Sequence, residues 1–96
     1  MLQHRCSPKP KIMDYAIYKT TNGKHLRIVH RFFQEKCNHR AKIQARTKLQ
    51  MMWLRALQQQ SNSRFEAASK DEFSYVHQTS ENTHDHLRFY IGELKP

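Results

Sequence analysis

Apolar and polar residues alternate along two stretches near the start of the chain, which is the pattern of half-buried β-strands. The stretches cover residues 12–20 and 24–33, and Asn22-Gly23 lies between them. Both central residues of a type I′ turn need positive φ, which Asn and Gly tolerate well. The pattern therefore predicts a tight β-hairpin with this dipeptide at its turn.

The turn also predicts a register that gives the hairpin one apolar and one polar face. The apolar face, which we expect in the core, collects Met13, Tyr15, Ile17 and Lys19 opposite Phe32, His30, Ile28 and Leu26. The polar, outer face pairs Asp14 with Arg31, Tyr18 with Arg27 and Thr20 with His25. A carboxylate opposite a guanidinium and a ring opposite a cation are favourable cross-strand pairs, which supports this register.

The middle of the chain has the three- and four-residue spacing of a long helix, from a cap at Asn38 to about Gln60. The inward stripe is Ala41, Ala45, Leu49, Met52, Trp53, Ala56 and Leu57. Ile43, Met51 and Leu54 fall on the opposite side. A helix that is apolar on two sides is either covered by a further layer, such as residues 64–70 with Phe65, or contacts another chain. In the second case these three residues could form a homodimer seam.

Strand patterns return in the last third of the chain. Residues 72–79 and 86–94 alternate, residues 80–84 read as a turn, and residues 64–71 fit either a short helix or a short strand. We therefore expect an α+β fold of order β-β-α-β-β, an antiparallel sheet with one long helix packed on one face. Pro8 and Pro10 mark residues 1–11 as a basic flexible arm, and residues 12–96 as a single small domain.

Composition narrows the class of protein. A length of 96 residues predicts one core, and no apolar run approaches the roughly 18–20 residues needed to span a bilayer. The N-terminus has no apolar signal segment, and two cysteines, Cys6 and Cys37, do not make a disulfide framework. We therefore expect a cytoplasmic protein that does not associate with membranes.

Charge is strongly divided along the chain. Residues 1–60 contain thirteen Lys and Arg against two acids, for a net charge of +11, whereas residues 61–96 contain four against six, for a net charge of −2. Such a field destabilises the compact state through self-repulsion, and a polyanion neutralises it. The sequence therefore predicts a nucleic acid, DNA or RNA, or a nucleoprotein complex as the partner.

The residues expected to bind nucleic acid are cations and a ring that can contact phosphates and bases. They are Tyr18, His25, Arg27 and Arg31 on the outer hairpin face, and Arg40, Lys42, Arg46 and Lys48 on the first turns of the helix. We expect an accessory or regulatory binding module that has no catalytic residues and no cofactor. The pattern does not distinguish DNA from RNA.

Two alternatives from other classes remain. The first is an interaction protein that inhibits or adapts a nucleoprotein complex through an acidic protein patch. The second is a metal-independent ribonuclease, with His86, Arg88 and Tyr90 on one strand face beside His77 or Tyr75. A metal site at His84-Asp85-His86 lacks the ligand spacing of closed zinc sites, so no metal is expected.

Overall fold

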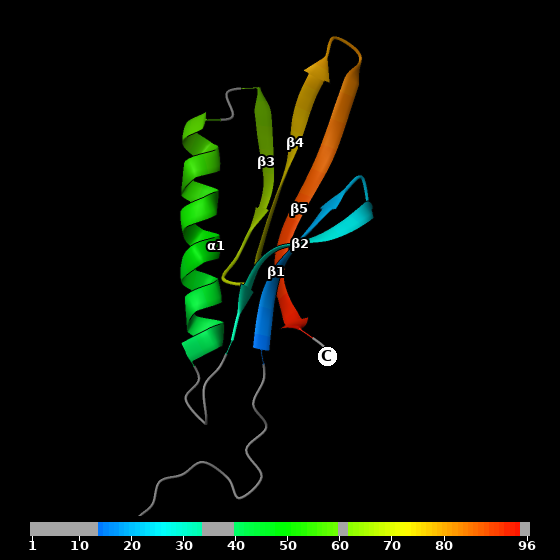
Figure 1. The fold of residues 1–96 in the computed structure, drawn as a ribbon. Helices are drawn as coiled ribbons and strands as arrows, with labels where there is room; N and C mark the ends of the chain where they lie inside the picture. The colour runs from blue at the N-terminus through cyan, green and yellow to red at the C-terminus, as the bar shows by residue number, and fades with distance from the viewer. Residues whose placement is uncertain (1–13, 34–39, 60–61, 95–96) are drawn as a thin grey trace, which may run out of the picture.

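The computed structural model describes residues 14–33, 40–59 and 62–94, which form one antiparallel sheet and one helix (Figure 1). The elements in chain order are β1 (Asp14–Thr21), β2 (Lys24–Phe32), α1 (Arg40–Gln59), β3 (Ser63–Ala68), β4 (Glu72–Ser80) and β5 (Thr83–Leu94). The strands are arranged β2-β1-β5-β4-β3, with β1 and β5 joining the two halves of the chain. The predicted α+β class is confirmed.

The structure contains one strand more than the predicted order β-β-α-β-β. The segment that fitted either a helix or a strand is β3, which pairs antiparallel with β4 at the edge of the sheet. Phe65 explains this choice, because its ring packs at 4.8 Å on that of Tyr75 in β4. A third layer over the helix, which was one interpretation of residues 64–70, is therefore wrong.

The β1–β2 turn forms at the predicted dipeptide, and φ is 56° at Asn22 and 73° at Gly23. The predicted register is wrong beyond the first pair, Thr21 with Lys24. Two irregularities shift β2 relative to β1, so that Lys19 faces Arg27 and Ala16 faces Arg31. The first coincides with His25, whose φ of 54° lies in the left-handed region that β-bulges use.

Directly opposed residues of neighbouring strands point to the same side of a sheet, so the register defines two faces. The core face carries Ile17 and Phe89, and the outer face carries Ala16 and Tyr90. Each extra residue in β2 moves the side chains that follow it to the opposite face of the sheet. The second extra residue therefore returns the side chains after it to the face that they would have had without either one. The expected inward position of Phe32 is therefore correct, whereas Ile28, opposite Tyr18, lies on the outer face.

One hydrophobic cluster joins the sheet and α1. Its buried members are Ile17, Phe32, Ala41, Ala45, Leu49, Phe73, Tyr75 and Phe89. Met52, Trp53 and Ala56 of the predicted inward helix stripe are partly buried against it. Two residues expected in the core are exposed instead, Leu26 by 60% and Leu57 by 45%.

Several predictions concern residues outside the described ranges. These are the arm at 1–11, Met13, the Asn38 cap, and the two cysteines, Cys6 and Cys37. They stay predictions.

Candidate nucleic-acid interface

The basic and the acidic parts of the sequence form different structural elements. β1, β2 and α1 contain one acid, Asp14, and nine cations: Lys19, Lys24, Arg27, Arg31, Arg40, Lys42, Arg46, Lys48 and Arg55. Residues 63–94 contain three cations, Arg64, Lys70 and Arg88, and six acids, Glu66, Asp71, Glu72, Glu81, Asp85 and Glu93. The cations of the first group therefore outnumber the carboxylates available nearby.

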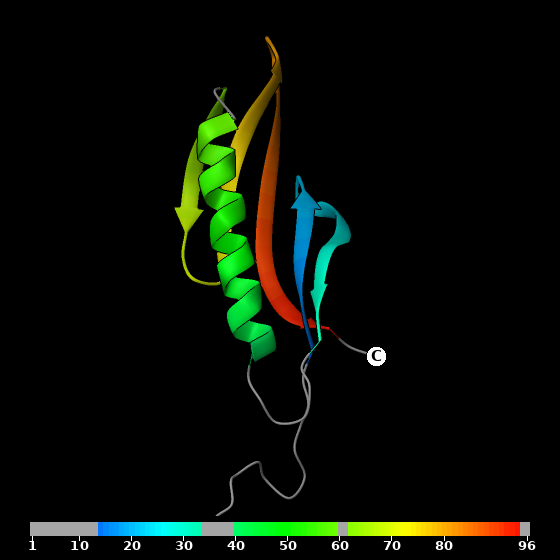
Figure 2. The ribbon, with the colours of Figure 1, turned by 60° about the vertical axis from the view of Figure 1, so that its left-hand side comes forward.

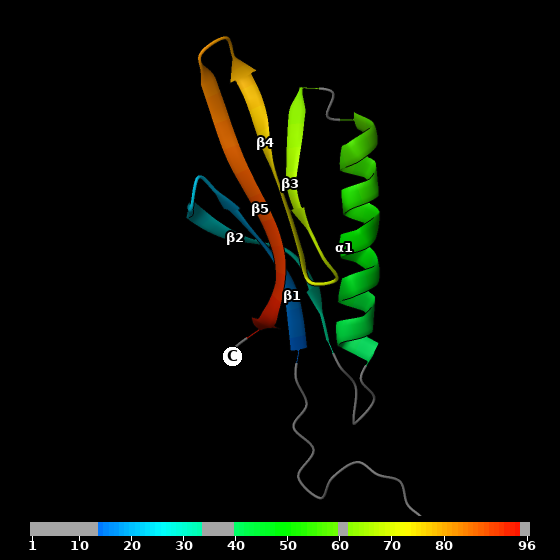
Figure 3. The ribbon, with the colours of Figure 1, turned by 180° about the vertical axis from the view of Figure 1, so that it is seen from behind.

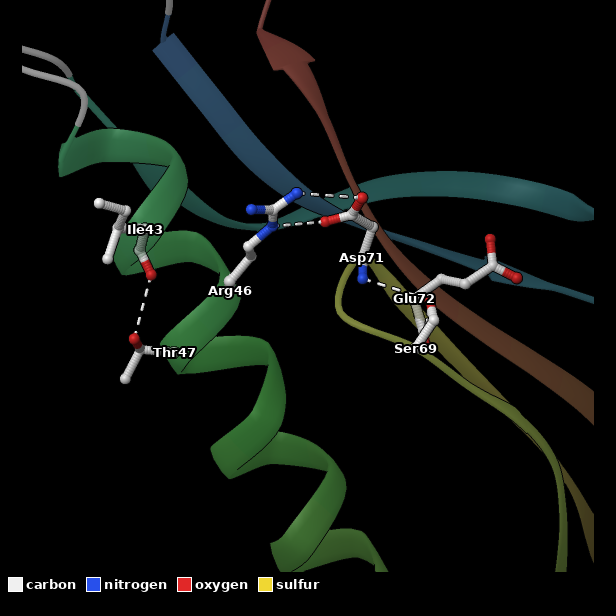
Figure 4. Close-up of polar contacts among 6 residues, drawn as sticks. All are labelled: Ile43, Arg46, Thr47, Ser69, Asp71 and Glu72. Atoms are coloured by element: carbon white, nitrogen blue, oxygen red, sulfur yellow. Dashed lines mark hydrogen bonds and ion pairs between the residues drawn. The ribbon is translucent and has the colours of Figure 1, made fainter.

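One cation of the helix is already neutralised. The Arg46 guanidinium donates from Nε to Asp71 Oδ1 at 2.8 Å and from Nη2 to Oδ2 at 3.4 Å (Figure 4). This hydrogen bonding to Arg46 lowers the pKa of Asp71, and nearby Lys42 and Lys70 act in the same direction. Arg46 thus links α1 to the turn between β3 and β4, and its charge is already paired with that of Asp71.

Lys48 and Arg55 project from the opposite side of α1. A helix turns by about 100° per residue, so positions two and nine residues after Arg46 are rotated from it by about 200° and about 180°. In Figure 2, β3 lies on one side of α1, β4 passes behind α1, and the β1–β2 hairpin lies on the other side. The two side chains therefore point toward the hairpin side, and neither makes an ion pair within the described residues.

Two cations of the hairpin lie on the face of the sheet that α1 also contacts. Lys19 is on the core face, because its ammonium lies 5.7 Å from the ring centroid of Phe89. Arg27 is directly opposite Lys19, so it points to the same side. We call Lys19, Arg27, Lys48 and Arg55 the basic surface.

Two predicted binding residues lie on the other side of the sheet. Arg31 is opposite Ala16 on the outer face. Tyr18 stacks on Tyr90 at 5.5 Å between ring centroids, and its hydroxyl donates to the Glu93 carbonyl at 3.0 Å. A Cβ on Gly92 would come within 2.9 Å of the Tyr18 ring, so this ring is held in a close-fitting position.

The other predicted binding residues lie at the ends of the basic elements. His25 is exposed beside the hairpin turn, at the far end from the start of α1. Arg40 begins α1 and is exposed. The Lys42 ammonium lies 5.9 Å from the ring centroid of Tyr15. Of the predicted binding residues on the hairpin, Arg27 therefore lies on the core face and Tyr18 and Arg31 on the outer face, whereas Arg46 is paired with Asp71.

The outer face of the sheet, whose strands Figure 3 shows from behind, holds a polar network in which charges are largely compensated. Arg88 bonds Glu72 at 2.8 Å and lies 4.4 Å above the Tyr90 ring. His86 Nε2 lies 2.9 Å from Glu66 Oε1. The residues of the ribonuclease alternative are divided, because Tyr75 and His77 point to the core face, away from His86, Arg88 and Tyr90.

The histidines considered for a metal site are divided in the same way. His84 and His86 lie on the outer face, whereas His77 lies on the core face, 3.1 Å from the Ser63 hydroxyl. In the described part of the chain, no three His, Cys, Asp or Glu side chains form a group that could hold a metal ion.

Lys19 and Arg55 are binding candidates that the sequence interpretation did not include. Arg55 follows Lys48 by seven residues, a spacing that repeats on one face of a helix, so the pattern could have revealed it. Lys19 shares the alternation of Ile17 and was placed in the apolar face. Arg27 lies on the same face only because of the β2 bulge, which no separate pattern in the sequence indicated.

The residues proposed for a homodimer seam are exposed, Ile43 by 60%, Met51 by 57% and Leu54 by 45%. In the described ranges, no helix combines the length and the apolar character that crossing a membrane requires.

Comparison with protein-family models, with curated proteins and with solved structures gives no match to this chain.

Proposed function

We propose that this protein is a small nucleic-acid-binding module without catalysis, and that the phosphate backbone binds to the basic surface. The observation that carries the proposal is the position of its four cations. Lys48 and Arg55 extend from α1 toward the hairpin side, and Lys19 and Arg27 extend from the hairpin on the face that α1 contacts.

Three cations of the basic surface lack charge compensation. Arg27, Lys48 and Arg55 form no ion pair with any described carboxylate. Phosphates would relieve the mutual repulsion of these cations, and the released counterions would drive association.

The test is fluorescence anisotropy of labelled single-stranded DNA, duplex DNA and single-stranded RNA, titrated with the full chain at 50 mM and 200 mM salt. We expect saturable binding that weakens steeply with salt, by roughly tenfold or more for several phosphate contacts. Absence of binding to all three probes at 50 mM salt would contradict the proposal.

The same samples separate the alternatives. An RNA probe that stays intact both with and without EDTA supports binding without catalysis. RNA cleavage that survives EDTA and is lost in His86→Ala would instead establish the ribonuclease alternative.

A further inference from the structure

A groove lies between α1 and the turn that joins β3 to β4, on the side of the helix away from the basic surface. Its volume is about 660 Å³. Apolar side chains from both elements line it: Ile43, Leu49, Trp53, Ala68 and Phe73. A space of this size can accept two or three side chains of a bound peptide or a small ligand.

The groove is bounded by cations. Arg46 and Lys70 line it, and none of its lining residues is acidic. Arg46 is held by Asp71, whereas Lys70 forms no ion pair with any described carboxylate. The groove therefore combines apolar walls with a positive charge at its edge that is in no close ion pair.

We propose that this groove binds a short acidic, amphipathic segment of a partner protein. Ile43 supports an apolar contact, because 60% of its surface is exposed at the groove. The partner should be acidic because Arg46 and Lys70 line the groove and none of its lining residues is acidic. α1 carries five cations and no acid, so two copies meeting through α1 would bring ten cations together, which opposes a symmetric helix-to-helix dimer.

Trp53 adds a second reason and a direct signal. Its indole Nε1 is buried and has no acceptor among the described residues, and a buried donor without a partner costs about 1–3 kcal/mol. A small reorientation of the ring toward a partner carboxylate or carbonyl would satisfy it. Trp53 is the single tryptophan of the chain, so its fluorescence reports on this groove alone.

This site is independent of the proposed nucleic-acid binding, because it uses the opposite side of α1. The probe is a synthetic 14-residue peptide with Leu at helical positions i, i+3, i+4 and i+7 and Glu at most others, without tryptophan. The control peptide carries Lys in place of Glu. Both are titrated into the full chain while the emission of Trp53 is recorded.

We expect a saturable change with the acidic peptide, with a Kd on the order of 10 µM, and at least tenfold weaker binding of the Lys peptide. Ile43→Glu should weaken binding of the acidic peptide about tenfold or more, and Lys70→Glu should weaken it too. Met51→Glu is the matched control, since Met51 is 57% exposed on the same helix and does not line the groove. It should change the Kd less than twofold, with circular dichroism confirming that each variant is folded.

Three results would overturn the inference. The first is equal binding of the Glu and Lys peptides, or no binding up to 1 mM. The second is an equal effect of Ile43→Glu and Met51→Glu. The third is self-association of the unliganded chain in light scattering that Ile43→Glu abolishes, which would make a second copy the occupant. Any of these can occur while nucleic-acid binding is intact, so the two proposals fail separately.

Discussion

Asn22 is the residue on which the most local geometry depends. Its positive φ closes the hairpin, its Nδ2 donates to Asp85 Oδ1 at 3.0 Å, and its Oδ1 accepts from the His86 amide at 2.7 Å. The same side chain thus shapes the β1–β2 turn and ties it to β5. Sequence reasoning could predict the turn but not this connection, because nothing in the local pattern indicates that β5 is the neighbour.

Two substitutions separate these roles. Asn22→Gly keeps the left-handed conformation and removes both side-chain hydrogen bonds, so we expect a loss of about 1–2 kcal/mol in the free energy of unfolding. Asn22→Ala also disfavours positive φ and should cost about 1 kcal/mol more. Urea denaturation measures both values.

The matched control is Asn82→Ala in the β4–β5 turn. Among the described residues, positive φ is confined to Asn22, Gly23 and His25, so Asn82 has no such requirement. Equal stabilities of Asn22→Gly and Asn22→Ala would show that the backbone conformation contributes nothing.

Asp71 is a second single residue whose role can be tested, because its contribution to stability depends on pH. Its pKa in the folded protein is lowered, chiefly by the hydrogen bonds from Arg46, whereas an unfolded chain has the ordinary value of about 3.9. Folding therefore favours the ionised carboxylate. The resulting stability is present above the unfolded pKa and is lost as the pH falls through the lower, folded pKa.

We expect Asp71→Asn to be less stable than the parent chain at pH 6, and the difference to shrink below about pH 4. Glu81→Gln, at an exposed carboxylate that makes no ion pair among the described residues, should show no such pH-dependent difference. Thermal melts between pH 2.5 and 6 would measure both. A difference for Asp71→Asn that stays constant with pH would rule out the ion pair as its source.

At the scale of elements, α1 has one buried side and one exposed apolar side, and the structure distinguishes them clearly. Leu49 is 2% exposed, whereas Leu54 is 45% exposed. Leu49→Ala should cost about 2–5 kcal/mol in the free energy of unfolding, a large share of what a small domain possesses. Leu54→Ala should change it by less than about 0.5 kcal/mol. Similar losses in urea denaturation would contradict this assignment of the helix sides.

The helix and the two C-terminal strands could be predicted closely from periodicity alone. β2 could not, because no pattern of apolar and polar residues in the sequence indicated its two register irregularities. A bulge reverses side-chain direction, so one undetected irregularity moved Arg27 to the other face. This single error explains why the predicted site mixes residues from both faces of the sheet.

Both edge strands are irregular. β2 and β3 each contain a register shift against their neighbour, and β2 carries Lys24, Arg27 and Arg31. Bulges and charges at sheet edges discourage the pairing of strands from separate molecules. Contacts with partners are therefore expected at the helix side and the core-face side of the hairpin rather than along the strand edges.

At the scale of the whole molecule, the two edges of the sheet differ in charge. β2, at one edge, carries three cations and no acid, whereas β3, at the other, carries one cation and one acid, and its neighbour β4 carries one acid. α1 adds cations toward the β2 edge and, through Arg46, makes an ion pair with Asp71 in the turn between β3 and β4. The molecule therefore presents a polarised surface that would orient a polyanion before contact.

Nucleic-acid binding at the basic surface is tested most directly by two double variants that remove the same charge from different faces of the molecule. Lys48→Ala with Arg55→Ala removes two cations of the basic surface. Arg31→Ala with Arg64→Ala removes two from the outer face, where they lie opposite Ala16 and Val76. The measurement is the affinity for whichever labelled nucleic acid binds the parent chain, by anisotropy at several salt concentrations.

We expect the basic-surface variant to bind at least tenfold more weakly and its salt slope to flatten by about 1.5–2. The outer-face variant should stay within about threefold of the parent, with a nearly unchanged slope. Equal losses in the two variants, or a greater loss in the outer-face variant, would contradict the placement of nucleic acid on the basic surface.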